Sequence, residues 1–324
     1  MQVVPMMLAL FSVLVPTKLW YAPNQPLNVQ IKTEQPLSLI LTGFDGKRID
    51  PRGSTDIATS TTVDIREMYP AVTNPGTYVL FAAPRGQGPA DFVGTPVVIE
   101  VMADKRPGAP SGPMVIRMEA LRYAVMTTEA GPITMAFYFD VAPNTADSFL
   151  RLASQGFFDG ITFHRIVPDF VIQGGDPRGD GTGGPGYNVA AEFNDRPHEE
   201  GALSMARNGD PNEGPGVMPR PEFANSAGSQ FFICLNYAHT KQLDTRYTCF
   251  GKVVEGMDAV KKIAATPIAD PNSGRPVNPQ VIQQVGVFSV TPGKNPYAGI
   301  IELGAPTPPA TQPATAPVPA ATHP

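Results

Sequence analysis

The chain contains few charged residues and almost no cysteine. Only 16% of its 324 residues are charged, against about 25% in an average soluble domain. The two cysteines, Cys234 and Cys249, are too few for a disulfide framework or a four-ligand zinc site. We expect two buried thiols on strands. A single cross-strand disulfide is the alternative, and it requires an oxidising compartment.

Basic clusters and long hydrophobic runs are also missing. The net charge is −5 and the pI is about 5.4, and no block of Lys and Arg is present, which argues against nucleic-acid binding. No segment reaches the ~18 apolar residues of a membrane span. The run from Val3 to Val15 has the length of a signal-peptide core, although no Lys or Arg precedes it. We therefore favour export to the periplasm or cell envelope. A buried first strand in a cytoplasmic protein is the alternative.

Proline and glycine are abundant, with 37 and 31 residues, which predicts many turns and short strands. Between residues 17 and 104, turn signals separate six segments rich in β-branched residues. They are Lys18–Tyr21, Leu27–Lys32, Pro36–Thr42, Thr61–Ile65, Thr77–Ala82 and Pro96–Val101. So many strands in a short span predict a small β-sandwich, immunoglobulin-like in form. Its sequence identifies no chemistry, so its ligand or protein partner is unknown.

Composition divides the chain further. Residues 1–16 form the apolar leader and residues 17–104 the sandwich, and the proline-rich residues 105–113 read as a linker. A second domain covers residues 114–291. The Pro/Ala/Thr-rich residues 292–324 cannot bury a core, so we expect disorder there.

In the second domain the periodicity predicts strands and two helices. Ala146, Phe149, Leu150 and Ala153 share one helical face, with a cap at Pro143–Thr145 and a stop at Gly156. The other elements are strands Met114–Thr128, Ile133–Asp140 and Gln280–Val290, and a helix Met257–Ala265.

A hairpin from Phe163 to Asp176 contains the most informative pattern. If its loop is the three residues 168–170, Arg165 lies opposite Gln173 on one face. A two-residue loop would instead pair Arg165 with Ile172. His164 should point to the opposite face and be structural.

Six blocks follow one another in a characteristic order. They are Phe163–Asp176, Gly181–Tyr187, Leu203–Arg207, Asn225–Ile233, Leu243–Asp244 and Phe250–Met257. Together they resemble the cyclophilin family of peptidyl-prolyl cis–trans isomerases over slightly more than half the chain. The resemblance implies a mainly β fold: a closed eight-stranded antiparallel barrel capped by two helices, with a proline-binding groove on its outer face.

The resemblance also implies roles for individual residues. Arg165 matches the catalytic arginine. Positions matching the substrate groove are Phe170, Val171, Gln173, Gly181, Ala206, Arg207, Gln230, Phe232, Leu243 and Tyr247. Such an enzyme needs no metal and no cofactor, and its partners are proline-containing polypeptides.

Three positions depart from the family, and one segment is extra. Gln242 replaces a tryptophan, which puts strong cyclosporin binding in doubt; Tyr247 replaces a histidine and Val171 a methionine. The extra segment runs from Asn212 to Ala224 and should protrude as a loop. These departures leave an alternative function open: a catalytically weak proline-peptide-binding scaffold with a ligand-binding N-terminal sandwich.

Overall fold

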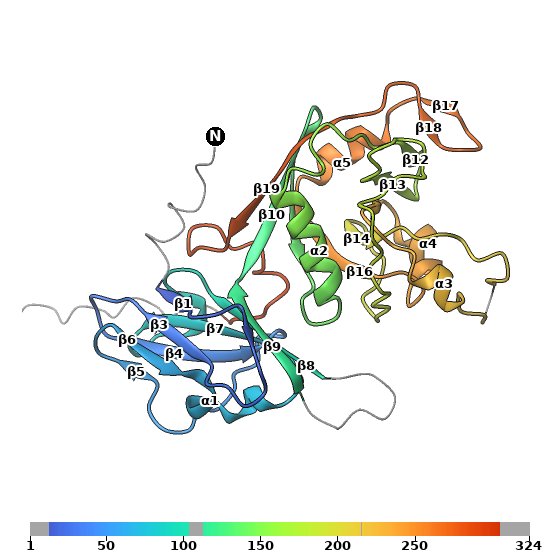
Figure 1. Ribbon diagram of the computed structural model, residues 1–324. Helices are drawn as coiled ribbons and strands as arrows, with labels where there is room; N and C mark the ends of the chain where they lie inside the picture. The colour runs from blue at the N-terminus through green and yellow to red at the C-terminus, as the bar shows by residue number, and fades with distance from the viewer. Residues whose placement is uncertain (1–12, 104–112, 215, 305–324) are drawn as a thin grey trace, which may run out of the picture.

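The computed structural model describes residues 13–103, 113–214 and 216–304 and is mainly β (Figure 1). An N-terminal module of two sheets lies beside a larger module built on one eight-stranded sheet. Most of the predicted linker, residues 1–12 of the apolar leader and residues 305–324 of the predicted tail lie outside the described residues. The disorder predicted for residues 292–304 is wrong, because Tyr297 and Ile301 are buried in the core.

The N-terminal module contains a three-stranded sheet, in the order β1-β3-β6, and a six-stranded sheet, in the order β2-β9-β8-β7-β4-β5. Their bounds are β1 Leu14–Pro16, β2 Trp20–Tyr21, β3 Asn28–Ile31, β4 Leu37–Gly43, β5 Asp56–Ile57, β6 Thr61–Asp64, β7 Gly76–Pro84, β8 Val97–Ala103 and β9 Pro113–Ala120. Short helices α1 (Ile65–Met68), η2 (Pro70–Thr73) and η3 (Pro89–Asp91) connect them. All six predicted strands are present. The immunoglobulin-like form of the sandwich stays a prediction.

Both faces of the six-stranded sheet are buried, as β7 shows. Because side chains alternate between faces along a strand, Leu80 and Ala82 join the core between the two N-terminal sheets. Val79 and Phe81 join the core of the larger module. The six-stranded sheet is therefore a middle layer with apolar packing on each side.

The predicted strand 114–128 is two strands. Residues Pro113–Ala120 form β9 beside β8, and Arg122–Thr128 form β10 in the larger module. Between them, the Leu121 N–H donates to the carbonyl of Pro96, 2.8 Å away, and the Leu121 carbonyl accepts from the N–H of Val290, at 2.9 Å. The chain thus changes sheets at Leu121 without a loop, which periodicity alone does not reveal.

The larger module is an antiparallel sheet in the order β12-β13-β15-β14-β16-β11-β10-β19. Its strands are β10, β11 (Gly131–Phe137), β12 (Arg165–Val167), β13 (Val171–Gly174), β14 (Ala202–Met205), β15 (Phe231–Cys234), β16 (Cys249–Glu255) and β19 (Ile282–Ser289). Its helices are α2 (Pro143–Ser154), α3 (Pro221–Ala224), α4 (Tyr237–Thr240), η4 (Lys241–Leu243) and α5 (Met257–Ala264). A separate pair, β17 (Ile268–Asp270) and β18 (Arg275–Pro276), follows α5.

The expectation of a closed barrel is wrong: in the described residues no ladder joins the edge strands β12 and β19. The chain from 160 to 163 fills that gap with single contacts, and Thr162 bridges both Asp176 and Val281. Gly160 and Gly175 have φ angles of 81° and 85°. This left-handed backbone interrupts the extended geometry that a continuous ladder needs.

The two predicted helices α2 and α5 are confirmed, but the cap of α2 is not local. Its N-terminal N–H groups at Asn144 and Thr145 donate to the carboxylate of Glu192, at 3.1 and 2.8 Å. A carboxylate here satisfies free N–H groups and complements the helix dipole.

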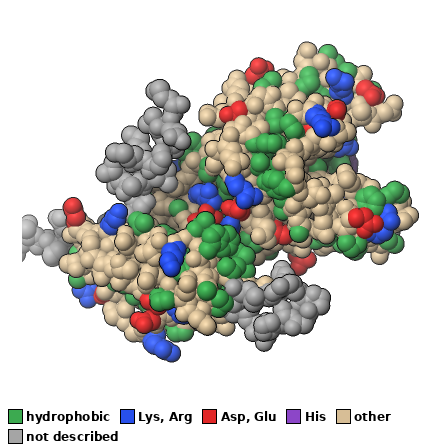
Figure 2. Space-filling model, viewed as in Figure 1, with side chains coloured by type: hydrophobic (Ala, Val, Ile, Leu, Met, Phe, Trp, Pro, Cys, Tyr) green, Lys and Arg blue, Asp and Glu red, His purple; other side chains and the backbone are tan. Residues whose placement is uncertain are grey.

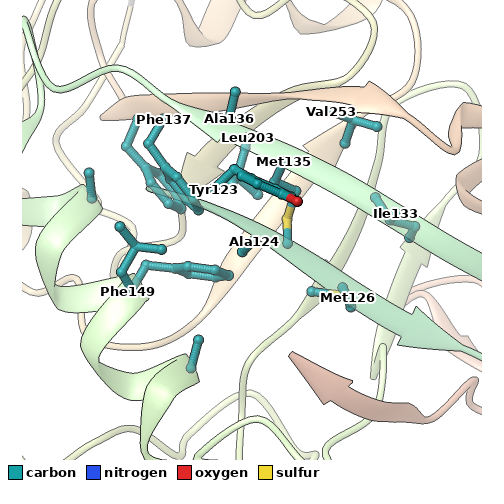
Figure 3. Packing of buried hydrophobic residues seen from close by; sticks show 14 of the residues in the cluster. Tyr123, Ala124, Met126, Ile133, Met135, Ala136, Phe137, Phe149, Leu203 and Val253 are labelled. Atoms are coloured by element: carbon teal, nitrogen blue, oxygen red, sulfur yellow. The ribbon is translucent and has the colours of Figure 1, made fainter. Parts of the chain in front are cut away.

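One hydrophobic core runs through both modules. Side chains of the larger module fill its interior, with Phe137 and Phe149 facing each other at 5.6 Å between ring centroids (Figure 3). Phe44 of the N-terminal module packs edge-on against Phe139 and against Tyr297, at 6.3 and 6.2 Å. The hydroxyl of the buried Tyr297 donates to the carbonyl of Arg122, 2.7 Å away. The modules are thus joined by apolar packing and not only by the chain.

Candidate active site

The β12–β13 hairpin has the three-residue loop that places polar residues on one face. Arg165 pairs with Gln173 and Val167 with Val171, which confirms the predicted register. Asp169 in the loop has φ 58°, a left-handed conformation that Asp tolerates better than most residues. The N–H of Phe170 donates to the carbonyl of Val167, 3.0 Å away, and closes the turn.

Strand alternation separates the core of the larger module from an outer surface. Ile172 and Ile233 join its interior. Val171 and Phe232 belong instead to a second apolar cluster on the other face of the same strands. Gln173 pairs with Phe232 across β13 and β15, so a polar and an aromatic side chain emerge side by side.

A pocket of about 200 Å³ opens on this outer face. It is lined by nine of the eleven residues that the sequence assigned to the site: Arg165, Phe170, Val171, Gln173, Ala206, Arg207, Phe232, Leu243 and Tyr247. The other two, Gly181 and Gln230, line an adjoining groove of about 750 Å³, which shares Gln173, Ala206 and Arg207 with the pocket. The structure thus brings every predicted site residue to one continuous surface.

A row of hydrogen bonds orients the polar side of the pocket. Nη1 of Arg165 donates to Oε1 of Gln173 at 3.1 Å, and Nε2 of Gln173 donates to Oε1 of Gln230 at 3.0 Å. Nε2 of Gln230 donates in turn to the carbonyls of Gly181 and Gly183, both at 2.9 Å. These bonds fix both amide orientations, so Gln173 presents its oxygen to the guanidinium.

Arg165 keeps its charge without a carboxylate partner. Among the described residues, none of the ion pairs involves Arg165. Burial lowers the pKa of Arg165 from its usual value, and the nearby Tyr247 hydroxyl opposes that shift. A guanidinium is not deprotonated in proteins, so the pocket wall carries an uncompensated cation with N–H groups available for a substrate.

A second arginine, Arg207, also lines the pocket but lies in a different environment. The guanidinium of Arg207 lies 4.3 Å from the ring centroid of Tyr247, and that ring packs edge-on against Phe232. Nη2 of Arg207 donates to both carboxylate oxygens of Glu213, at 2.7 and 2.8 Å. Glu213 belongs to the extra segment. The family resemblance does not extend to this segment, and no sequence signal predicted the pair.

Sequence reasoning also missed a polar network behind the pocket. The ring of His198 stacks on Phe232, its Nδ1 lies 2.9 Å from Oδ1 of Asp244, and its Nε2 lies 3.0 Å from Oγ of Ser204. Burial lowers the pKa of His198, against the opposing effect of Asp244. Asp244 directly follows Leu243, so this network holds two pocket residues in place. His164 is buried and does not line the pocket, consistent with the predicted structural role.

The remaining sequence expectations concern thiols, metals and membranes. Cys234 and Cys249 are free and buried, and burial raises the pKa of Cys249 to about 12. In the described part of the chain, no cluster of three or more His, Cys, Asp or Glu side chains is arranged to hold a metal. No helix in these same residues has the length and apolar character to cross a bilayer.

Comparison with known proteins agrees with this geometry. Residues 123–287 match the family model described as cyclophilin type peptidyl-prolyl cis-trans isomerase/CLD. A peptidyl-prolyl cis-trans isomerase of Synechococcus elongatus is 45% identical over 129 residues, which are 40% of this chain and 78% of the relative. Isomerase B of Bacillus subtilis is 41% identical over 140 residues, 42% of this chain and 85% of its own.

A crystal structure of a Cryptosporidium parvum cyclophilin type isomerase aligns with 52% of this chain and 98% of its own, at 27% identity and a TM-score of 0.46. The match of the family model to half of the sequence and the two bacterial relatives decide the assignment. The chain belongs to the cyclophilin-type peptidyl-prolyl cis–trans isomerase family.

Proposed function

We propose that this pocket binds the proline ring of an extended polypeptide and that Arg165 is the catalytic residue. The observation that carries the proposal is the pairing of Arg165 with the neutral amide of Gln173 at the edge of an apolar pocket. A cation held in this way is oriented but not neutralised, so it remains available to a reacting group.

The reaction requires only that the twisted amide be favoured over the planar one. Delocalisation of the nitrogen lone pair makes rotation about a peptide bond cost about 18–20 kcal/mol. At the top of this barrier the lone pair is localised on nitrogen and accepts a hydrogen bond. A donor that meets electron density only in the transition state lowers the barrier. The guanidinium of Arg165 is such a donor.

The apolar residues supply the other half of the mechanism. Phe170, Phe232 and Leu243 surround a space of about 200 Å³, suited to a proline ring. Burial of that ring holds one side of the bond while the preceding carbonyl rotates. The row from Gln173 through Gln230 to the 181–183 loop then orients the backbone before the proline.

A two-dimensional NMR exchange measurement on an Ala-Pro tetrapeptide tests the proposal. The wild-type protein is expected to accelerate exchange, and Arg165→Ala to reduce the catalysed rate by about 100-fold or more, by analogy with the deletion of an oxyanion-hole donor. Arg85→Ala, on the surface of the N-terminal module, is the matched control. Binding of the peptide by wild type without faster exchange would reject catalysis and favour a proline-binding scaffold.

Three finer features belong to the same proposal. The substrates are folding proteins whose X–Pro bonds exchange slowly. The N-terminal module, immunoglobulin-like in form, binds a separate ligand or protein. Export to the cell envelope rests on the apolar run from Val3 to Val15, whose last residues overlap strand β1, Leu14–Pro16. Amino-terminal sequencing of the native protein tests that location, since an intact Met1 would contradict cleavage.

A further inference from the structure

Two carboxylates hold the segment that distinguishes this chain from its family, and one of them, Glu213, binds a residue of the pocket wall. Asp210 accepts from the N–H, Nε and Nη2 of Arg220, at 2.9, 3.0 and 2.9 Å. Glu213 accepts from Arg207 through both oxygens and from Nε of Arg246 at 2.9 Å. The predicted loop is therefore tightly anchored.

Glu213 meets arginines that lie on, or next to, the pocket. Arg207 lines the pocket, and its side chain is only 2% exposed. Arg246 directly precedes Tyr247, another lining residue, and reaches the carbonyls of Gly214 and Val217, at 2.9 and 2.7 Å. The carboxylate thus lies behind the wall that the substrate contacts, without itself lining it.

The carboxylate of Glu213 affects the net charge of the side chains that line the pocket. Arg165 and Arg207 are the two ionised side chains that line it. Burial raises the pKa of Glu213, but hydrogen bonds from Arg207 and Arg246 outweigh burial and lower it overall, so the carboxylate is ionised at neutral pH. Arg207 is therefore compensated by a bidentate partner, whereas Arg165 faces a neutral amide.

We propose that Glu213 determines the charge preference of the pocket: by compensating Arg207, it leaves Arg165 as the single free cation among the described residues that line the pocket, so that residues beside the proline are not selected for acidity. The inference rests on the proposed isomerase site. Without Glu213, Arg207 would attract a carboxylate next to the proline and repel an amine. Glu213 thus determines specificity without touching the substrate, since its effect passes through Arg207.

The test compares three tetrapeptides that differ only in the residue before proline, which is Glu, Ala or Lys. Their KM, kcat and Kd are measured with wild type, Glu213→Gln and the control Glu222→Gln. Glu222 belongs to the same segment, its side chain is 59% exposed, and it pairs with Arg220, 3.3 Å away. Both substitutions remove one negative charge, but only the first leaves Arg207 uncompensated.

For Glu213→Gln we expect tighter binding of the Glu-Pro peptide and weaker binding of the Lys-Pro peptide, each by about two- to fivefold. The difference should shrink in 1 M salt, where the Debye length is about 3 Å. A merely structural role would instead shift KM of all three peptides in the same direction. Glu222→Gln should behave as wild type.

A second comparison protects the test against misfolding. Arg207→Gln and the double variant Arg207→Gln/Glu213→Gln differ only in the negative charge of Glu213. Neither protein contains Arg207, so neither has an unpaired arginine at that position. Because Glu213 acts through Arg207, the double variant should show the same ratio of Glu-Pro to Lys-Pro affinity as Arg207→Gln. Unchanged Kd ratios in Glu213→Gln, or an equal shift in the Arg207→Gln background, would overturn the proposal. Because Kd is read without turnover, this failure is distinct from the absence of isomerase activity in wild type.

Discussion

Arg165, half-buried in the pocket, and Arg117, buried at the junction of the two modules, have different partners. Arg165 donates to a neutral amide. Arg117 forms ion pairs with Glu100, with Glu119 at 3.6 Å and with Asp147 of α2 at 2.9 Å. On the face in Figure 2, basic and acidic side chains gather where the modules meet.

The pKa values of the two guanidinium groups shift in opposite directions because their partners differ. Burial alone dominates at Arg165 and lowers its pKa. At Arg117 burial acts in the same direction, but Glu100, Glu119 and Asp147 outweigh it and raise the pKa. An arginine surrounded by carboxylates holds structure together, whereas one oriented by a neutral partner keeps its charge for a ligand. Changing each arginine in turn tests this contrast.

Arg117→Met should cause the largest loss of stability. Removing the cation leaves carboxylates buried at the junction, and breaking a buried ion pair costs about 3–5 kcal/mol. Urea denaturation at pH 7 measures the loss, with Arg85→Met as the control, since the Arg85 side chain is 68% exposed. An unchanged midpoint would mean that this cluster does not hold the modules together. The double variant Arg117→Met/Glu100→Gln should recover part of the loss.

Protonation of Glu100 should give a smaller, pH-dependent effect. Burial raises its pKa from 4.5 to about 7, although Arg117 opposes the shift. The proton is therefore held more tightly in the folded chain, so this group's contribution to stability is complete below pH 4.5 and is lost as pH rises to 7. We expect a fall of about 3 kcal/mol. Denaturation curves of wild type and Glu100→Gln across this range measure it, and identical slopes would contradict it.

Arg165→Lys is the mildest change in this series. Lysine keeps the positive charge but lacks the planar fork that bonds Gln173 while another N–H faces the substrate. We expect catalysed exchange of an Ala-Pro peptide to fall about tenfold, with the free energy of unfolding unchanged within about 0.5 kcal/mol. Full activity would show that charge alone is sufficient and that the Gln173 contact is dispensable.

Local patterns predicted those parts of the fold and site that depend on neighbours in the sequence. Strand alternation and the Pro168–Phe170 loop determine the register that places Arg165 beside Gln173. Helix α2 follows from four apolar residues at helical spacing. The resemblance to a known family then placed the other pocket residues on the same surface.

Features that depend on distant partners were not predictable in this way. The change of sheet at Leu121 depends on Pro96 and Val290, and the cap of α2 comes from Glu192. Closure of the sheet failed because two glycines adopt left-handed backbone where a ladder was expected. Glu213 lies in a segment outside the family pattern, so its contact with Arg207 is apparent only in the folded structure.

The packing of Phe44 on Phe139 and Tyr297 affects how this enzyme can be divided. Excision of residues 123–287, the span that matches the family, would shorten β19 and remove Tyr297. It would also remove the apolar side chains of the N-terminal sheet from the surface of the larger module that they cover. An isolated catalytic fragment would then expose an apolar surface to water. Such a fragment should therefore be limited by poor solubility and not by loss of the catalytic residues.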